Sequence, residues 1–543
     1  MLTVSNVSVS FTGKKLYDDV NLKFTPGNTY GVIGANGAGK STFLKVLEGK
    51  LQPTTGTVSM EANERMSSLV QDHFAFDEFT VLDTVMQGHK ELYDVKNQMD
   101  EIYTHDPFTD EDGIKVGELS ARFEELNGWS AETEAAQLLQ SLGIAEDQHY
   151  TMMADLPEVT KVKVLLAQAL FGNPDILILD EPTNGLDTKT IAWLEDFLAE
   201  YQNIVIVVSH DRHFLNAVST MILDVDFGKI KLFVGNYDFW KESSELAQRL
   251  QSQANAKKEE QIKELQDFIA RFSANASKSK QATSRKKQLE KITLDDIQPS
   301  TRKYPYINFE IQREIGNDML RVENLSKTVD GVKLLDNISF TVRPNEKALV
   351  MAENDVAATA LLDIIAGNDT PDSGEVTWGV TTSHDYLAKD MNVNFPKPEM
   401  PILDYLRDFA SKEESDNTFL RGLLGRMLFK GEDAEKTLDV LSGGEKVRVM
   451  LSKLMLTKPN VLVLDDPTNH LDLESITSLN DGLINFKGGI IFTSHDHTFA
   501  QTIADHIIVV SDQGAIDRAE TTYDEFMAHP EVQKQLAEKN ITL

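Results

Sequence analysis

The sequence contains no cysteine, which excludes disulfides, thiol nucleophiles and cysteine-ligated zinc sites. Long apolar runs are also missing, since segments such as Ile204–Val208 are far shorter than the ~20 residues needed to span a membrane. The opening residues MLTVSNVSVSF lack the charged and then apolar layout of a secretory signal. These absences predict a cytoplasmic protein without membrane contact.

Positive charge is scarce in this chain. Its 543 residues include 86 Asp and Glu but only 53 Lys and Arg, which gives a formal net charge of −33. That charge disfavours diffuse binding to nucleic acid or to an anionic membrane. Hydrophobic residues make up 41% of the chain, which is ordinary for globular domains with sizeable cores.

One stretch, residues 271–291, reverses the sign of the charge. It has a local charge of +6 from seven cations and one anion: Arg271, Lys278, Lys280, Arg285, Lys286, Lys287 and Lys291 against Glu290. A run of charge usually marks a solvated helical face, whereas a reversal of sign also suits an anionic partner. Composition alone leaves both interpretations open.

The chain contains an internal repeat. Residues 2–20 match residues 320–338 at an offset of 318. Further along the chain the offset falls to 285, where Asp180 matches Asp465. The first half therefore carries 33 more residues than the second half over the same region.

Two helical additions accompany the repeats. The 33 surplus residues should lie mostly in an arm at about residues 89–144, where the amphipathic segment 112–142 predicts a helical hairpin on the surface. Between the repeats, residues 236–315 begin with a long helical pattern free of Gly and Pro, and continue through the basic stretch to a second helical pattern. We therefore expect two antiparallel helices with a basic tip, joining domains at residues 1–235 and 316–543.

A phosphate-binding loop is indicated at Gly34–Ser41, which fits the pattern G-x-x-x-x-G-K-[ST]. It follows an apolar strand pattern at Tyr30–Ile33 and precedes a helical pattern at Thr42–Leu47, as the motif requires. Its backbone N–H groups and the helix N-terminus favour phosphates; Lys40 reaches the β/γ-phosphates and Ser41 is a Mg²⁺ ligand. The residues expected to bind ATP here are Gly34, Ala35, Asn36, Gly37, Ala38, Gly39, Lys40, Ser41 and Thr42.

Two further strand ends carry groups suited to nucleotide hydrolysis. The apolar segment Asp175–Glu181 ends in two carboxylates, of which Asp180 would hold Mg²⁺ through water and Glu181 would act as general base. The strand pattern Ile204–Val208 leads to His210, which would contact a γ-phosphate.

The motifs GANGAGKST, LILDEPTNGLD, VVSHD and LSGGEKVRVMLSKLM resemble those of ATP-binding cassettes. Two cassettes with a helical arm and a basic hairpin between them resemble the ABC-F subfamily, and within it the YbiT-like branch. The resemblance covers essentially the whole chain. By resemblance, Gln71 matches the glutamine loop and becomes a catalytic residue and Mg²⁺ ligand, and Phe11 matches the aromatic residue that stacks on adenine.

This resemblance implies an α/β fold of two tandem P-loop ATP-binding cassette domains joined by a two-helix hairpin linker. Each cassette would have a mostly parallel sheet and a helical subdomain. The resemblance further implies a cytoplasmic ATPase that uses ATP and Mg²⁺ and works as a monomer whose own cassettes pair. Its partner would be the ribosome near the tRNA exit site, with the hairpin contacting rRNA and tRNA.

The second half departs from the phosphate-loop pattern. The offset of 318 places Ala352–Thr359 opposite the first loop. At the matched positions, Ala352 replaces Gly34, Ala357 replaces Gly39, Ala358 replaces Lys40, Val329 replaces Phe11 and Asp466 replaces Glu181. No glutamine occurs from residue 376 to 400, and Ser383-His384 stands where the glutamine is expected. Losing the lysine removes a charge-assisted contact worth ~1.5–3 kcal/mol.

The first half has a matching loss in the signature motif. The intact signature starts a helix whose N–H groups can meet a γ-phosphate, and its residues are Ser442, Gly443, Gly444 and Glu445. Its counterpart Leu156–Thr160 brings negative charge at Glu158 and bulk at Val159. Because cassettes pair head to tail, Leu156–Thr160 and Ala352–Thr359 should share one composite site. We expect hydrolysis only at the other site.

Three functions remain open from the sequence. The first is an ABC-F-type translation factor with hydrolysis at one composite site. The second is the ATPase subunit of a transporter, which would need a surface coupled to membrane helices. The third is a nucleotide-binding regulatory protein with little turnover.

Overall fold

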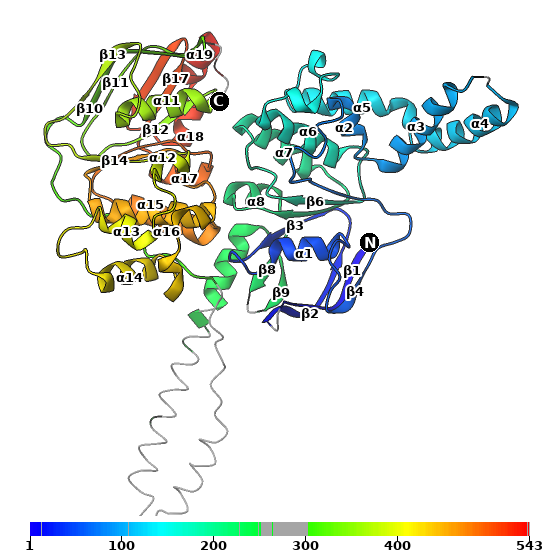
Figure 1. Ribbon diagram of the computed structural model, residues 1–543, viewed down its shortest axis with the longest axis horizontal. Coiled ribbons are helices and arrows are strands. Elements are labelled where there is room, and N and C mark those ends of the chain that lie inside the picture. The colour runs from blue at the N-terminus through cyan, green and yellow to red at the C-terminus, as the bar shows by residue number, and fades with distance from the viewer. Residues whose placement is uncertain are drawn as a thin grey trace, which may run out of the picture.

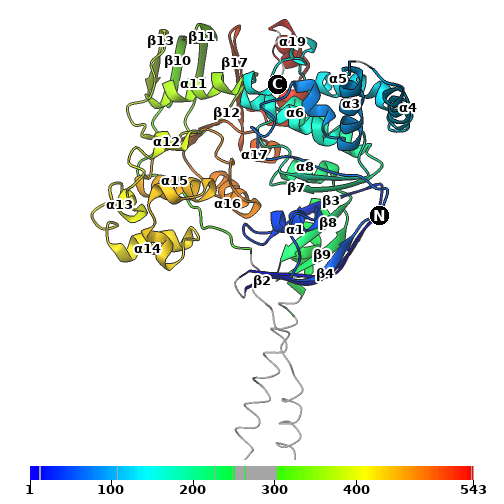
Figure 2. The same ribbon diagram turned by 45° about the vertical axis from the view of Figure 1, so that its right-hand side comes forward.

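The computed structural model describes residues 1–247 and 302–541 except residues 12, 13, 107, 227 and 540; between 248 and 301 it describes only residues 249, 250, 253 and 263. The predicted basic tip, residues 271–291, therefore lies outside the described residues, as does most of the predicted linker 236–315 apart from its two ends. Two similar α/β units fill the described part and lie side by side (Figures 1 and 2).

The first unit is built on a six-stranded sheet of order β5-β6-β7-β3-β8-β9, in which only β8 and β9 pair antiparallel. Its strands are β3 (Asn28–Ile33), β5 (Met66–Ser68), β6 (Ile176–Asp180), β7 (Ile204–Val208), β8 (Met221–Asp226) and β9 (Lys229–Val234). An antiparallel sheet packs beside it, with β1 (Leu2–Phe11), β2 (Lys14–Phe24) and β4 (Thr55–Ser59). The apolar strand β7 is buried throughout, as expected for a parallel strand covered on both faces.

The helices of the first unit lie around this sheet and in a separate helical part. They are α1 (Lys40–Leu47), α2 (Val81–Met86), α3 (Lys90–Tyr103), α4 (Asp110–Glu125), α5 (Gly128–Ser141), α6 (Glu158–Leu170), α7 (Thr188–Ala199) and α8 (Arg212–Val218), with short 3-10 turns at Glu146–Gln148 and Met153–Asp155. Helices α2, α5 and α6 pack against one another.

The arm differs in detail from the hairpin expected at residues 112–142. The antiparallel pair is α3 with α4, which projects from the body in Figure 1, while α5 returns to pack on α2 and α6. The reason is the composition of α5, whose Ala131, Ala135 and Leu139 are buried in the core of the body.

The second unit repeats the architecture with a sheet of order β14-β15-β16-β12-β17-β18 and an antiparallel sheet β11-β10-β13. Its strands are β10 (Leu320–Val329), β11 (Val332–Val342), β12 (Lys347–Ala352), β13 (Ser373–Trp378), β14 (His384–Leu387), β15 (Val461–Leu464), β16 (Gly489–Phe492), β17 (His506–Ser511) and β18 (Gly514–Ala519). Its helices are α11 (Asp355–Ala366), α12 (Met391–Asn394), α13 (Ile402–Arg407), α14 (Asn417–Arg426), α15 (Gly443–Thr457), α16 (Leu473–Ile484), α17 (His497–Ile503), α18 (Tyr523–Ala528) and α19 (Pro530–Glu538), with 3-10 turns at Gly431–Glu435 and Leu438–Val440. The predicted fold class, two tandem α/β units with mostly parallel sheets, is confirmed.

The two units are arranged head to tail. In both views the antiparallel sheet of one unit lies at the end of the molecule opposite to that of the other (Figures 1 and 2). Helices α8 and α17 touch between the units, where the rings of His213 and His497 lie 4.4 Å apart. Arg302, near the C-terminal end of the predicted linker, also joins the units, because it pairs with Asp224 of β8 at 2.6 Å and with Glu474 of α16 at 2.9 Å.

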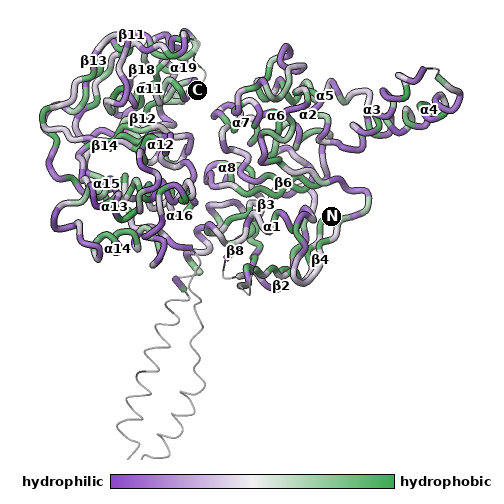
Figure 3. The backbone as a smooth tube through the Cα atoms, viewed as in Figure 1, coloured by the Kyte–Doolittle hydropathy of each residue, from purple (hydrophilic) through white to green (hydrophobic). Residues whose placement is uncertain are grey.

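Apolar residues concentrate in the central sheets and the helices packed on them (Figure 3). Within the part of the chain that the structure describes, no helix combines the length and the apolar character needed to cross a membrane.

Candidate functional site

The first phosphate loop forms an open cradle before α1. Gly37 and Gly39 have φ angles of 77° and 103°, which L side chains rarely adopt, and a Cβ atom on Gly37 would meet nothing within 4 Å. Lys40 is only 7% exposed, and its Nζ donates to the carbonyl oxygen of Gly34 at 2.7 Å. Burial lowers the pKa of Lys40, although nearby carboxylates led by Glu181 oppose this. The cradle therefore holds a buried cation at its centre.

The three predicted Mg²⁺ ligands lie together at the end of β6. Gln71 donates from Nε2 to Oδ2 of Asp180 at 3.0 Å, and the hydroxyl of Ser41 also hydrogen-bonds this carboxylate. Burial raises the pKa of Asp180, and these two hydrogen bonds and the charge of Lys40 act in the opposite sense. Carboxylate, hydroxyl and amide oxygens suit a hard cation such as Mg²⁺.

The predicted general base Glu181 and His210 form a buried pair. Glu181 has a φ of 52°, a strained value for a residue other than glycine, and its N–H donates to Val208 O at 2.8 Å. Its Oε2 accepts from the N–H of His210 at 3.1 Å. Burial raises the pKa of Glu181 to about 8 and lowers the pKa of His210 to about 4. Burial therefore disfavours the charged form of both side chains.

These residues fit a bound Mg²⁺–ATP. Among the described residues, Nδ1 of His210 and Oε1 of Glu181 make no hydrogen bond, although Oε1 lies 3.3 Å from the ring Nε2 of His210. Buried polar atoms without partners are rare and usually face a ligand or water. Together with the open cradle and the Asp180 cluster, they leave hydrogen-bonding capacity for a nucleotide and its attacking water.

A cavity of about 880 Å³ joins this cluster to the other unit. Its first-unit walls include the loop before α1, Gln71, Asp180, Glu181 and His210, and its second-unit walls include Asp466, Thr468, Asn469 and His470. We call this cavity the consensus site. It confirms that one site uses residues from both units, as head-to-tail packing requires.

Some predicted ATP-binding residues do not line the cavity, namely Gly34, Ala35 and Ala38 of the phosphate loop, Phe11 and the signature residues. Phe11 lies at the end of β1 and is 48% exposed. Ser442, Gly443, Gly444 and Glu445 begin α15, where the Ser442 hydroxyl accepts from Glu445 N–H and caps the helix. His470, which lines the cavity, lies directly against these signature residues, since a Cβ atom on Gly443 would lie 2.8 Å from the His470 ring. The signature and adenine contacts therefore remain predictions.

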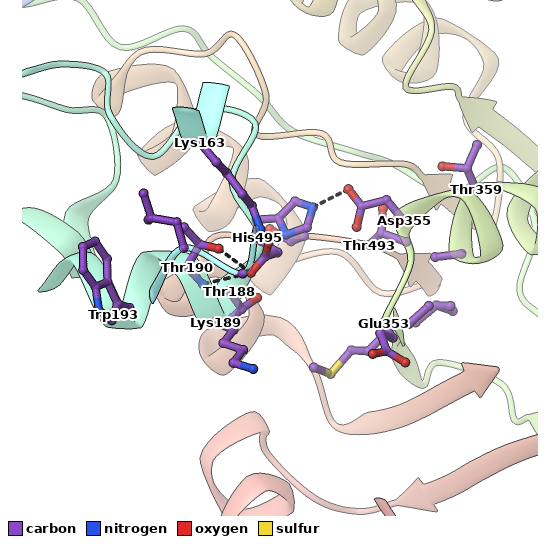
Figure 4. Close-up of a pocket in the computed structure, with 18 of the residues that line it drawn as sticks. Lys163, Thr188, Lys189, Thr190, Trp193, Glu353, Asp355, Thr359, Thr493 and His495 are labelled. Carbon is purple, nitrogen blue, oxygen red and sulfur yellow. Dashed lines mark hydrogen bonds and ion pairs between the residues drawn. The ribbon is translucent and has the colours of Figure 1, made fainter. Parts of the chain in front are cut away.

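A second cavity, of about 470 Å³, contains the second-unit half of the predicted degenerate site (Figure 4). Its second-unit walls include Ala352, Ala358 and Thr359, and its first-unit walls include Lys163 of α6 and Trp193 of α7. We call this cavity the degenerate site. The predicted first-unit half, Leu156–Thr160, does not line it, and Val159 lines the consensus site instead. In the degenerate site, Asp465 accepts from Thr359 Oγ1 at 2.8 Å and from Thr493 Oγ1 at 2.7 Å. The aspartate–hydroxyl pair of the consensus site is thus retained.

The expected position of the missing glutamine was wrong. Strand β14 pairs with β15 as β5 pairs with β6, placing His384 opposite Val461 and Met66 opposite Ile176. The offset of 318 therefore still holds at this strand, and it carries Gln71 onto Lys389 rather than onto Ser383-His384. Extending the offset past the phosphate loop would have found this lysine in the sequence.

The raised pKa of Glu181 gives a prediction for stability. The folded chain holds this proton more tightly than the unfolded chain, so the contribution of Glu181 to the free energy of unfolding weakens as pH rises from about 4.5 through about 8. Glu181→Gln should therefore stabilise the chain relative to wild type at pH 9 by about 2–4 kcal/mol, and much less at pH 5. Urea unfolding of both proteins at the two pH values measures this.

The control for that experiment is Glu200→Gln, which changes an exposed glutamate at the end of α7. Its difference from wild type should be the same at pH 5 and pH 9. A Glu181→Gln difference that does not grow with pH would show that the carboxyl is ionised in the folded chain.

Comparisons with known proteins agree with the geometry. A family model described as "ABC transporter" matches residues 17–184 and 335–469, and a second model of the same description matches residues 223–309. The "Uncharacterized ABC transporter ATP-binding protein YkpA" of Bacillus subtilis is 60% identical over 538 residues, covering 99% of each chain. The "Probable ATP-binding protein YbiT" of Escherichia coli O157:H7 is 46% identical over 517 residues, covering 95% of this chain and 97% of that one.

Solved structures share the arrangement of the whole chain. The complex of archaeal ribosomal stalk protein aP1 with the archaeal ribosome recycling factor aABCE1 matches with a TM-score of 0.63 at 15% identity, covering 99% of this chain and 93% of that chain. A structure titled "RNase-L Inhibitor" matches with a TM-score of 0.61 at 15% identity, with the same coverage. At this identity the likeness concerns the fold.

Proposed function

Since the chain belongs to the ABC-F subfamily of ATP-binding cassette proteins, we propose that it is a translation factor that hydrolyses ATP at the consensus site only. ATP binding closes the two cassettes while the protein is on the ribosome near the tRNA exit site, and hydrolysis reopens them. The observation that carries the one-site proposal is that Ala358, which replaces the phosphate-binding lysine, lines the degenerate site together with Lys163 of α6, the helix that stands in place of the signature helix.

Each residue of the consensus site has a defined task in this proposal. Lys40 and the loop N–H groups hold the β- and γ-phosphates, while Ser41, Gln71 and Asp180 hold Mg²⁺, which neutralises charge on the phosphates. Glu181 accepts a proton from the attacking water, and its neighbour His210 orients it through the backbone hydrogen bond. The strained φ of Glu181 aims its carboxylate into the cavity.

Three observations support the ribosome as the partner. The first is that the chain belongs to the ABC-F subfamily. The second is the basic stretch 271–291, which lies between the cassettes of an otherwise acidic chain. That stretch concentrates the cations that RNA phosphates attract. The third is the whole-chain fold likeness to a structure titled as a ribosome recycling factor. A transporter subunit would leave the basic stretch without a role.

The decisive experiment is ribosome pelleting with the Glu181→Gln variant. This variant should bind ATP without hydrolysing it, so the cassettes stay closed and the chain should sediment with 70S ribosomes in ATP. With ADP it should remain in the supernatant. If it does not sediment in ATP, or sediments with membranes instead, the translation-factor proposal fails.

The matched variant for the pelleting assay changes three cations of the tip, Lys278, Lys280 and Lys286, to Glu in the Glu181→Gln background. If the tip neutralises RNA phosphates, pelleting should weaken and its steep dependence on salt should become shallower. The melting temperature should be unchanged. Pelleting equal to that of the parent at all salt concentrations would rule out a role for the tip in binding.

A further inference from the structure

An acidic side chain, Asp355, lines the degenerate site and also reaches the second-unit wall of the consensus site. We propose that the carboxylate of Asp355 occupies the place of a nucleotide phosphate in the degenerate site, so that this site is filled from within and the chain binds one ATP. The inference rests on the proposed pairing of the cassettes around two sites. It adds which group replaces the nucleotide phosphate in the degenerate site.

Two side chains from separate loops converge on one oxygen of Asp355. Nζ of Lys389 and Nε2 of His495 each lie 2.9 Å from Oδ2 of Asp355. Figure 4 shows His495 pointing at this carboxylate across the cavity. Lys389 and His495 are the counterparts of Gln71 and His210, whose side chains line the consensus cavity. An acidic side chain thus sits between the two loops that flank the phosphate position.

Charge favours this arrangement. Partial burial opposes ionisation of Asp355, but the hydrogen bond from His495 and the charge of Lys389 hold its pKa well below the usual range. Burial would lower the pKa of His495, yet Asp355 and Asp466 together raise it. In the consensus site the pKa of His210 moves the other way. His495 thus already has an anionic partner in Asp355.

The backbone of the second cassette also lacks the open phosphate-binding loop of the first cassette. The offset of 318 sets Asp355 opposite Gly37, and Ala357 opposite Gly39. Neither has a positive φ, and α11 begins at Asp355, whereas α1 begins only at Lys40. The segment that forms an open loop in the first cassette is therefore the first turn of a helix in the second.

In that helical turn, the backbone N–H groups that could bind a phosphate are already hydrogen-bonded within the chain. The N–H of Ala357 donates to the Asn354 carbonyl oxygen at 2.9 Å, and the N–H of Val356 donates to the Asn354 side chain at 2.9 Å. Ala358, in the place of the phosphate-binding lysine, is 5% exposed and packs in the hydrophobic core. The second cassette has thus replaced both the lysine and the phosphate with an internal ion pair.

The stoichiometry of nucleotide binding tests the proposal. Equilibrium dialysis of Glu181→Gln with radiolabelled ATP and Mg²⁺ should saturate at one nucleotide per chain. Saturation at two would overturn the proposal and leave one-site hydrolysis untouched, since a second ATP can bind without turnover. Conversely, one nucleotide per chain with no ribosome pelleting would support the internal anion and count against the translation role.

Chemical rescue tests Asp355 itself. Asp355→Ala leaves the facing groups of Lys389 and His495 without their anion, and formate is small enough to replace the lost carboxylate. Formate should raise the melting temperature of Asp355→Ala by about 2–4 °C more than an equal concentration of chloride does.

The matched control is Asp369→Ala, which removes an ion pair with Lys327 (2.7 Å) beyond the other end of α11. Formate should have no greater effect than chloride on this variant or on wild type. If formate stabilises all three proteins equally, or none of them, Asp355 does not fill an anion site and the proposal is wrong.

Discussion

Glu181→Gln should lower steady-state ATP hydrolysis at least about hundredfold, because removing a general base typically costs ~10²–10⁴. Glutamine keeps the shape of the side chain and the hydrogen bond from the His210 N–H, but it cannot take a proton from water. Phosphate release at saturating ATP measures the loss. ATP affinity, measured by dialysis, should stay within a few fold of wild type.

The same preparations must melt cooperatively, so that lost activity is not lost folding. A Glu181→Gln protein that is folded, binds ATP and keeps a tenth or more of wild-type turnover would show that another group accepts the proton. His210 would then be the first candidate, since its Nε2 lies 3.3 Å from Glu181 Oε1.

Ser442→Arg should lower hydrolysis by at least about tenfold, which is the lower end of what losing aligned N–H donors around a transition state costs. Ser442 caps α15 and prepares its first N–H groups to face a γ-phosphate. In this structure the signature lies against His470 and does not line the consensus site, so the loss would also show that the cassettes close further during turnover. Phosphate release at saturating ATP is again the measurement.

The matched control is Pro157→Arg, at the corresponding exposed N-cap of α6 in the first cassette. This position belongs to the degenerate site predicted from the sequence, and α6 has no side-chain cap to lose. Turnover should stay within about threefold of wild type. Equal losses in the two variants would mean that the arginine acts on folding or on both sites alike.

Strand patterns and the repeat were readable from the sequence because each rests on local chemistry. The apolar runs ending at Asp180 and Val208 form β6 and β7 as expected, since a parallel strand covered on both faces is apolar along its length. The loop before Lys40 followed from its glycines, whose positive φ values the structure displays. The end of β6 and the loop before α1 bring Asp180, Glu181 and Lys40 into one cavity.

The internal ion pair of the degenerate site could not be predicted in the same way. Asp355, Lys389 and His495 come from three separate segments, and no local pattern says that they meet on one oxygen. Lys389 occupies the register position of Gln71, but because it is a different residue type its identity alone does not mark it as the counterpart. The buried state of Glu181, and the pKa that follows from it, depend on packing between distant strands.

The central claim is that only the consensus site hydrolyses ATP, and Asp466→Asn tests it most directly. Asp466 is the counterpart of Glu181 in the second cassette, in the same strained conformation with a φ of 48°. Phosphate release at saturating ATP should be compared for Asp466→Asn, Thr359→Ala and Glu181→Gln. The account predicts that the first two stay within about threefold of wild type, while the third falls at least about hundredfold. If Asp466→Asn falls as far as Glu181→Gln, both sites hydrolyse ATP and the one-site account is wrong.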